Sequence, residues 1–194
     1  MELEERKYSV LIVCAGENLT SALSSLMPES RYYPIRFVSS VSAARREWNA
    51  MSYDYVIINS PCRDDNGVDL SIDVVSSKSA VALLLLPPDL QDAISGNVLR
   101  HGVYTLPKPL SRHSLSNALD WMAATRERLR NLENKTLSLE EKMAEIRMVN
   151  RAKWLLISAL GMDESSAHRY IEKKAMDSSV SKKEVADLII KTYS

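Results

Sequence analysis

The stretch Ala152–Lys191, which reads AKWLLISALGMDESSAHRYIEKKAMDSSVSKKEVADLIIK, has the pattern of three short helices. Its first segment has an apolar face and ends at Gly161, the residue type that commonly closes a helix. Asp163 is placed to cap the second segment, and Ser181 followed by Glu184 forms a capping box that opens the third. Because apolar residues recur in helical steps and no run fits a strand, the stretch predicts an all-α module.

The order and spacing of residues in this stretch resemble the ANTAR domain. The positions that carry the resemblance are Ala152-Lys153, Leu155-Leu156, Gly161, Ala167, Tyr170-Ile171, Ala175-Met176-Asp177, Val185-Ala186 and Ile189-Ile190. That family is a small three-helix RNA-binding module of transcription antitermination regulators, so the resemblance implies this fold and RNA binding here. Two positions depart from the family pattern, because Trp154 stands where Gly is usual and Ile146 stands where a basic residue is usual. Both departures concern the RNA surface rather than the fold.

The chain has 194 residues, a length that suits one or two domains. Its net charge is zero, but residues 123–194 hold 14 Lys and Arg against 11 Asp and Glu, a mild surplus compatible with a nucleic-acid partner. No run of about 18 apolar residues is present, so no membrane span is expected. The charged N-terminus lacks a signal-peptide core and two cysteines offer no disulfide framework, so a cytoplasmic location is expected.

Upstream of the helical stretch, short apolar runs alternate with helical patterns. Strands are expected at Ser9–Val13, Ile35–Val38, Tyr55–Ile58, Val81–Leu86 and Val103–Leu106. Helices are expected between them, at Leu19–Leu26, Val41–Asn49, Leu70–Val75 and Leu90–Val98. Continuous apolar runs are typical of strands that are buried on both faces, and alternating strands and helices of this length form parallel sheets. The sequence therefore predicts an α/β domain with a flavodoxin-like, doubly wound five-stranded parallel sheet.

This α/β region, about residues 7–122, resembles the receiver domain of response regulators. The resemblance is carried by Leu11–Val13, Asp54–Asn59, Gly102 and Lys108-Pro109. In that family an Asp at the end of the third strand accepts a phosphoryl group, and an acidic pair after the first strand holds Mg²⁺. A hydroxyl after the fourth strand and a Lys after the fifth contact the phosphate. The resemblance therefore implies where a phosphorylation site would lie.

Most of that phosphorylation site is replaced in this chain. The phosphoacceptor position is Asn59, whose amide cannot attack a phosphoryl donor. Cys14-Ala15-Gly16 stands in place of the acidic pair, so few hard oxygen ligands remain for Mg²⁺, and of the site residues only Lys108 survives. The loop acids Asp64 and Asp65 are expected to be merely solvated. We therefore predict a receiver-like domain without a cofactor, kept for dimerisation or for docking of a sensor protein.

The region Ser111–Arg151 contains no Gly or Pro and carries an apolar stripe flanked by charges of both signs. Such a stripe is typical of a coiled coil, whose natural use is homodimerisation. The predicted dimer seam consists of Leu129, Leu132, Leu139, Met143 and Ile146. The alternative is that the stripe packs back on the chain's own receiver-like domain. The sequence does not decide whether Asn134–Thr136 interrupts the helix.

The basic residues of the C-terminal module are candidates for contacts to RNA phosphates, which supply much of the affinity for nucleic acid. Lys153 matches a family position, whereas Arg151, Lys182 and Lys183 are inferred only from their placement on the expected helices. The stem of Lys153 is expected to pack at the edge of the core while its ammonium reaches solvent. The alternative for all four is an ordinary solvated helix face. Tyr170 is expected to lie in the core, as aromatic residues at helical spacing usually do.

No other group of residues predicts catalysis or metal binding. His101, His113 and His168 lack the spacing of metal ligands, and no Gly-rich phosphate loop or nucleophile elbow is present. Cys14 and Cys62 follow neighbouring strands, so a redox switch is conceivable, but small apolar filling is the expected role. We therefore expect the chain not to be an enzyme.

These patterns divide the chain into a receiver-like domain (7–122), a coiled-coil linker helix (123–138) and an ANTAR-type RNA-binding domain (139–194). The expected function is transcription antitermination by binding to hairpins of a nascent leader transcript. One alternative is a DNA-binding response regulator that uses residues 156–171 as a helix-turn-helix. A second alternative is a protein-interaction adaptor.

Overall fold

A computed structural model describes residues 7–193 of the chain, apart from the side chain of Glu17. The chain forms two compact units, one that ends at Asn131 and one that begins at Leu132. Helix α5, Arg112–Leu160, contributes to both units and runs without interruption through residues 134–136. Within the described range, no helix is long and apolar enough to cross a membrane.

The first unit is built around a sheet of five parallel strands in the order β2-β1-β3-β4-β5. The strands are β1 Tyr8–Val13, β2 Tyr32–Val38, β3 Tyr55–Asn59, β4 Val81–Leu86 and β5 Tyr104–Pro107. Every residue of β4 is buried, as are four of the five residues of β3. Burial on both faces explains why these strands read as continuous apolar runs. The predicted flavodoxin-like class is confirmed.

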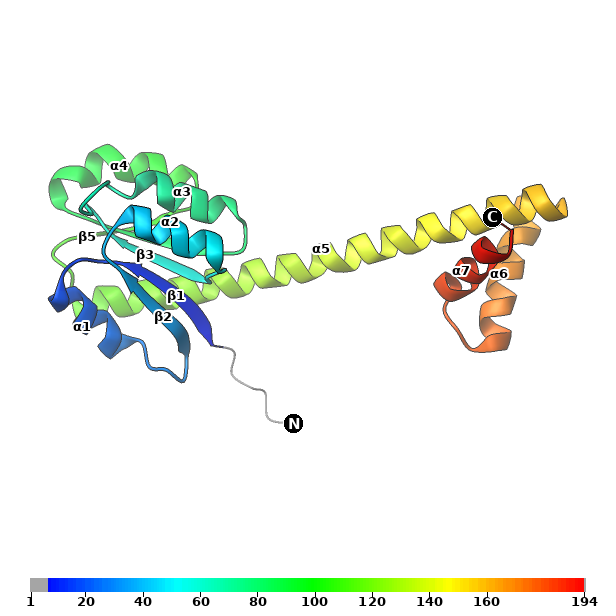
Figure 1. The fold of residues 1–194 in the computed structure, drawn as a ribbon, viewed down its shortest axis with the longest axis horizontal. Coiled ribbons are helices and arrows are strands. Elements are labelled where there is room, and N and C mark those ends of the chain that lie inside the picture. The colour runs from blue at the N-terminus through cyan, green and yellow to red at the C-terminus, as the bar shows by residue number, and fades with distance from the viewer. Residues whose placement is uncertain (1–6, 194) are drawn as a thin grey trace. The chain divides into compact units, whose positions relative to one another are not determined.

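Helices cover both faces of this sheet (Figure 1). They are α1 Glu17–Leu26, α2 Val41–Ala50, α3 Val68–Ser76 and α4 Pro88–Arg100, together with the first part of α5. One core cluster joins the sheet to α1 and α5, and the other joins it to α2, α3 and α4. The apolar stripe predicted for Ser111–Arg151 begins with Leu115, Leu119 and Met122, and these three residues lie in the first cluster. The N-terminal part of the stripe therefore does pack on its own receiver-like domain.

The turn before α3 explains one glycine of the sequence. Gly67 has a φ of 75°, in the left-handed region that side chains rarely adopt. A Cβ at this position would also lie 2.5 Å from Cγ2 of Ile58, which belongs to β3. The close approach and the positive φ together require glycine at this point, just beyond the carboxyl end of the strand.

The second unit packs the end of α5 against α6, Glu164–Ser178, and α7, Lys182–Tyr193. Its helix ends follow the sequence, because Gly161 has a φ of 65° after α5 and the Asp163 carboxylate accepts a hydrogen bond from the Ser166 N–H at 2.7 Å. The capping box is also formed, since the Ser181 N–H donates to Glu184 at 2.8 Å and the Glu184 N–H donates to the Ser181 hydroxyl at 3.2 Å. These caps confirm the predicted helix boundaries.

The core of this unit contains small and branched residues rather than aromatic ones. Its buried members are Ala152, Leu156, Ala167, Ile171, Ala175, Val185, Ala186 and Ile189. The expectation that Tyr170 belongs to this core is wrong, because the side chain is 39% exposed. Ala167, Ile171 and Ala175 recur every four residues and form the buried face of α6, so a residue one step before Ile171 lies beside that face.

Candidate nucleic-acid interface and the receiver-like site

Asn59 lies at the end of β3, at the position where a receiver carries its phosphoacceptor. Its amide nitrogen is 3.8 Å from the Cys14 sulfur, and the Cys62 thiol donates a weak hydrogen bond of 3.5 Å to the Asn59 carbonyl. Burial and the nearby acidic side chains of the loop raise the pKa of the Cys62 thiol to about 11. The thiol is therefore protonated at neutral pH and is a weak nucleophile. The phosphoacceptor position is therefore occupied by an amide, that of Asn59, with the thiols of Cys14 and Cys62 next to it.

The lysine that survives from the receiver pattern has a partner of its own. The Lys108 ammonium donates a hydrogen bond of 2.6 Å to the backbone carbonyl of Ser60. Burial lowers the pKa of this ammonium. Lys108 thus ties the loop after β5 to the loop after β3.

The two loop acids, Asp64 and Asp65, are not merely solvated, because both carboxylates accept hydrogen bonds from backbone N–H groups. The Asp64 carboxylate accepts hydrogen bonds of 2.9 Å from the N–H groups of Val41 and Ser42, at the start of α2. These bonds and one from the Ser42 hydroxyl lower the pKa of Asp64 to about 2. Asp65 accepts a hydrogen bond of 2.6 Å from the Gly67 N–H, next to the start of α3. Asp64 binds the start of a helix more than twenty residues earlier in the chain, which a local pattern does not show, whereas Asp65 closes a turn with a residue two positions on.

A buried ion cluster in the first unit was not predicted. The Asp54 carboxylate, only 13% exposed, lies 2.7 Å from the Arg126 guanidinium and 2.8 Å from that of Arg130. It also accepts hydrogen bonds of 3.0 and 3.2 Å from the backbone N–H and hydroxyl of Ser9. Burial raises the pKa of Asp54, but the hydrogen bonds from Ser9 and the two arginines outweigh it, so the pKa is lowered overall. We call Asp54, Arg126 and Arg130 the buried triad.

In the second unit, the side chain of Lys153 is only 16% exposed, and its ammonium lies 3.1 Å from the Glu164 carboxylate. This mostly buried side chain belongs to a part of α5 in which Ala152 and Leu156 are fully buried. The next residue, Trp154, points away from that core and is 70% exposed. Glu164 opens α6, so the ion pair joins the last part of α5 to the start of the following helix.

The other predicted RNA-binding residues differ in their surroundings. The Lys182 ammonium lies 2.5 Å from the Glu172 carboxylate, which is also 3.3 Å from the His168 ring. Arg151 and Lys183 are exposed, and within residues 7–193 neither side chain forms an ion pair. Two of the four predicted cations are therefore held by carboxylates of the same unit, and two are directed to solvent.

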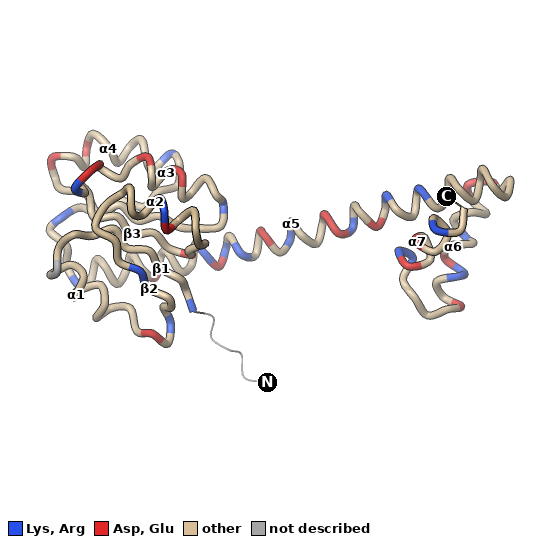
Figure 2. The backbone as a smooth tube through the Cα atoms, viewed as in Figure 1, with Lys and Arg blue, Asp and Glu red and all other residues tan. Residues whose placement is uncertain are grey.

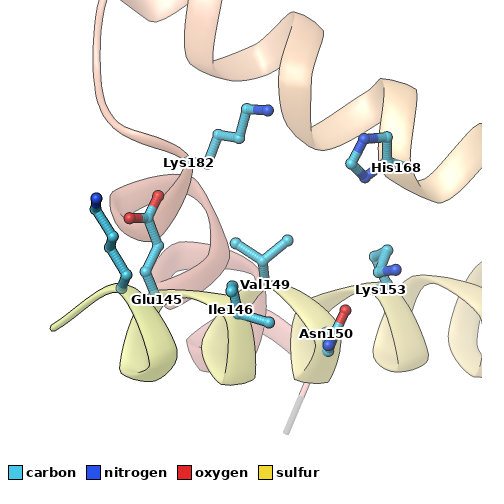
Figure 3. A pocket seen from close by; sticks show the side chains of 8 residues that line it. Glu145, Ile146, Val149, Asn150, Lys153, His168 and Lys182 are labelled. Atoms are coloured by element: carbon cyan, nitrogen blue, oxygen red, sulfur yellow. The ribbon is translucent and has the colours of Figure 1, made fainter. Parts of the chain in front are cut away.

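Lys153 and Lys182 line one pocket of about 420 Å³ within the second unit (Figure 3). Val149 and Lys153 project from α5 toward the side of the pocket that carries His168 and Lys182. Arg151 and Lys183 are not among the lining residues. The structure therefore brings two of the predicted residues together and leaves the other two outside.

The predicted dimer seam is divided between the two units. Leu129 packs against the core of the receiver-like domain, whereas Leu132, Leu139, Met143 and Ile146 are each more than half exposed. Their positions recur at alternating steps of three and four residues when Thr136 is included. Lys and Arg alternate with Asp and Glu along α5 (Figure 2). An exposed apolar stripe with charged flanks lies on the middle of this helix.

Comparisons with known proteins agree with both halves of the chain. A family model described as the ANTAR domain matches residues 137–190. The transcriptional regulatory protein PdtaR of Mycobacterium tuberculosis is 27% identical over 139 residues, which cover 72% of this chain and 68% of that protein. The aliphatic amidase regulator of Pseudomonas aeruginosa is 37% identical over 76 residues, which cover 39% of this chain and 38% of that protein.

A solved structure gives the same result for the fold of the first unit. It is the signal receiver domain of an HD domain-containing protein from Pseudomonas fluorescens Pf-5. The TM-score is 0.54 at 22% sequence identity, and the match covers 66% of this chain and 93% of that chain. At this identity the likeness shows the receiver fold alone.

Proposed function

Because this chain is a transcription regulator that joins a receiver-like domain to an ANTAR domain, we propose that it binds hairpins of a nascent leader transcript and acts as an antiterminator. The observation that carries the proposal is the ANTAR match over residues 137–190, which includes the family position Lys153. Arg151 and Lys183 offer exposed cations for phosphate on the same unit.

Electrophoretic mobility of the chain with hairpin RNA and with duplex DNA of equal length tests this proposal. Preferential retardation of the hairpin is the expected result. Retardation of duplex DNA alone would favour a DNA-binding regulator that uses residues 156–171. Retardation of neither would favour a protein-interaction adaptor.

The regulator works without phosphorylation at the usual receiver position. Asn59 supplies no carboxylate there, Asp64 and Asp65 accept hydrogen bonds from backbone N–H groups, and Asp54 is held by two arginines. Incubation with labelled acetyl phosphate and Mg²⁺ is expected to leave the chain unlabelled. A stable phosphoprotein whose label is lost on changing Asp54 or Asp65 would contradict this part of the proposal. In the absence of phosphorylation, the proposed role of the receiver-like domain is to serve as a docking surface for a sensor protein.

The chain forms a homodimer through the exposed part of the seam, because apolar side chains on a charged helix are stabilised by burial against a second copy. Changing Leu132 and Leu139 together to Asp places charges in the seam, where burial without a partner is costly. Sedimentation is expected to show a monomer whose receiver-like domain stays folded. Leu137→Asp is the matched control, because Leu137 is equally exposed on the same helix but lies outside the seam. A parent chain that is already monomeric at high micromolar concentration would overturn the dimer.

A further inference from the structure

The pocket of about 420 Å³ in the second unit combines an apolar floor with a basic rim. Ile146 and Val149 supply the apolar surface, and Lys142, Lys153 and Lys182 supply the cations. Two groups suited to a flat heterocycle also line it, namely the ring of His168 and the amide of Asn150 (Figure 3). The volume falls within the usual range for small-molecule sites, roughly 300 to 1,000 Å³.

We propose that this pocket receives a single unpaired nucleotide from the loop of the bound RNA hairpin. The inference rests on the proposed RNA-binding function and names the part of the RNA that would be read. Sequence-specific RNA recognition mostly uses unpaired bases that stack on rings and form hydrogen bonds along their edges. His168, whose ring lies 3.3 Å from the Glu172 carboxylate, lines the pocket and offers a face for the base to stack on, and Asn150 offers both a donor and an acceptor to the edge of the base.

The amide of Asn150 is available for such a contact. Its side chain is exposed, and among the described residues it forms no hydrogen bond. An amide that is left to water in the free protein can exchange that water for a base edge without breaking a contact of the fold.

The charges around the pocket suit a phosphate that exchanges with a carboxylate. Lys153 is held by Glu164, which is 78% exposed, and Lys182 by Glu172, which is 40% exposed and also lies 3.3 Å from the His168 ring. Lys142 forms no ion pair with any residue in the described part of the chain. An incoming phosphate therefore finds one ammonium without an ion pair in the described residues and two that are held by carboxylates, of which Glu164 is the more exposed. Glu145, which also lines the pocket, disfavours an approach of phosphate from its own side.

A second copy of α5 is the competing occupant, because Ile146 belongs to the dimer seam as well as to the pocket floor. The next positions in the same three- and four-residue register are Asn150 and Lys153. Polar and charged residues there end the apolar stripe, and burying a lysine against an apolar helix is costly. These residues favour RNA over a partner helix at the pocket.

Two sets of hairpins test the inference on the full chain. One set carries 2-aminopurine at each loop position in turn and reports fluorescence, and the other has each loop base replaced in turn and reports binding affinity. We expect the fluorescence of 2-aminopurine to change strongly at one loop position, and replacement of the natural base there to weaken binding about tenfold, as for loss of a specific base contact. Asn150→Ala should remove this discrimination between bases and leave the dependence of affinity on salt unchanged. His168→Ala should reduce the fluorescence change at the same position.

Lys183→Ala is the matched control, because Lys183 is a cation of the same unit outside the pocket. It should reduce the salt dependence and leave the base preference intact. Base preference retained in both Asn150→Ala and His168→Ala would overturn the pocket while the RNA-binding function stands. Variants that shift the monomer–dimer equilibrium and leave base preference unchanged would show that the partner helix fills the pocket. If the parent chain binds no hairpin, the proposed RNA-binding function itself is contradicted.

Discussion

Asp54 in the receiver-like domain and Glu164 in the ANTAR domain both form ion pairs with basic side chains of α5, but the Asp54 carboxylate is buried and the Glu164 carboxylate is exposed. Asp54 is 13% exposed and contacts Arg126, Arg130 and Ser9, whereas Glu164 is 78% exposed and forms an ion pair with Lys153. Removing one partner from a buried ion pair leaves an uncompensated charge in a poorly solvated place. Removing one partner from an exposed pair returns the other to water at little cost.

The difference in exposure between the ion pairs of Asp54 and of Glu164 indicates that they have different roles. The buried triad fixes the first part of α5 to the sheet, since Arg126 and Arg130 lie on the helix and Asp54 precedes β3. In the pair of Lys153 with Glu164 the lysine is 16% exposed and the carboxylate 78%, so the carboxylate can move into water and another anion can take its place. A surface that binds RNA phosphate needs contacts of the second kind.

The largest expected effect is on the buried triad. Asp54→Ala removes the carboxylate that two guanidinium groups share, and Arg130 keeps only its pair with the half-exposed Glu127 at 2.7 Å, so the change should lower the free energy of unfolding of the receiver-like domain by about 3–5 kcal/mol. Hydrogen exchange of peptides from β1 and β3 measures this loss. Asp73→Ala is the control, because Asp73 forms an exposed pair with Arg45. Equal losses in both variants would remove the distinction between the two kinds of pair.

Acidification should weaken the buried triad. The pKa of Asp54 is lowered in the folded chain, relative to an ordinary value of about 3.9. The stabilisation by its carboxylate is therefore fully present above about pH 4 and is lost as the pH falls through the folded-state pKa. Urea unfolding of the parent and of Asp54→Asn should differ by a constant amount between about pH 7 and 5, and the difference should shrink below about pH 4. A difference that grows on acidification would contradict this assignment.

A smaller effect, on the affinity for hairpin RNA, is expected at Lys153, because its substitution removes one proposed phosphate contact. Lys153→Ala should weaken hairpin binding and reduce the slope of log affinity against log salt by about 0.7 to 0.9. Preference between loop sequences should change little, because a phosphate contact positions the chain and does not read bases. The melting temperature of the variant serves as the folding control. A variant that binds hairpin RNA as the parent does throughout a salt titration would place the RNA surface elsewhere, on Arg169–Lys174.

The features that could be predicted from the sequence depend on residues that lie close together in the chain. Continuous apolar runs gave the strands, and Asp163, Ser181 and Glu184 gave the helix starts, because a cap depends on residues three apart. Asn59 and Lys108 were identified because the resemblance to receiver domains gives the roles of residues at the ends of the third and fifth strands, and those strand ends are recognisable in the sequence. These features need no knowledge of distant contacts.

The features that were missed depend on residues far apart in the chain. Asp54 meets Arg126 and Arg130 across more than 70 residues, and Lys153 meets Glu164 across the α5–α6 turn. Tyr170 was misplaced because helical spacing shows that a residue is near the apolar face but not on which side of it. Whether residues 134–136 interrupt α5 was open because polar residues without Gly or Pro neither require nor exclude a break.

The smallest expected effect is at Glu164, and it gives the sharpest contrast with Asp54. Glu164→Gln removes a charge that is mostly in water, so the melting temperature of the ANTAR domain should stay close to that of the parent. The same change frees the Lys153 ammonium and removes a negative charge next to it, so affinity for hairpin RNA should rise, by up to about fivefold if the exposed pair contributes up to about 1 kcal/mol. In the double variant Glu164→Gln with Lys153→Ala this gain should disappear, because the carboxylate acts on RNA through that lysine. The comparison requires all three measurements at one salt concentration, since the gain is screened at high salt. A gain that persists without Lys153 would assign the effect of Glu164 to general repulsion of RNA rather than to exchange at this pair.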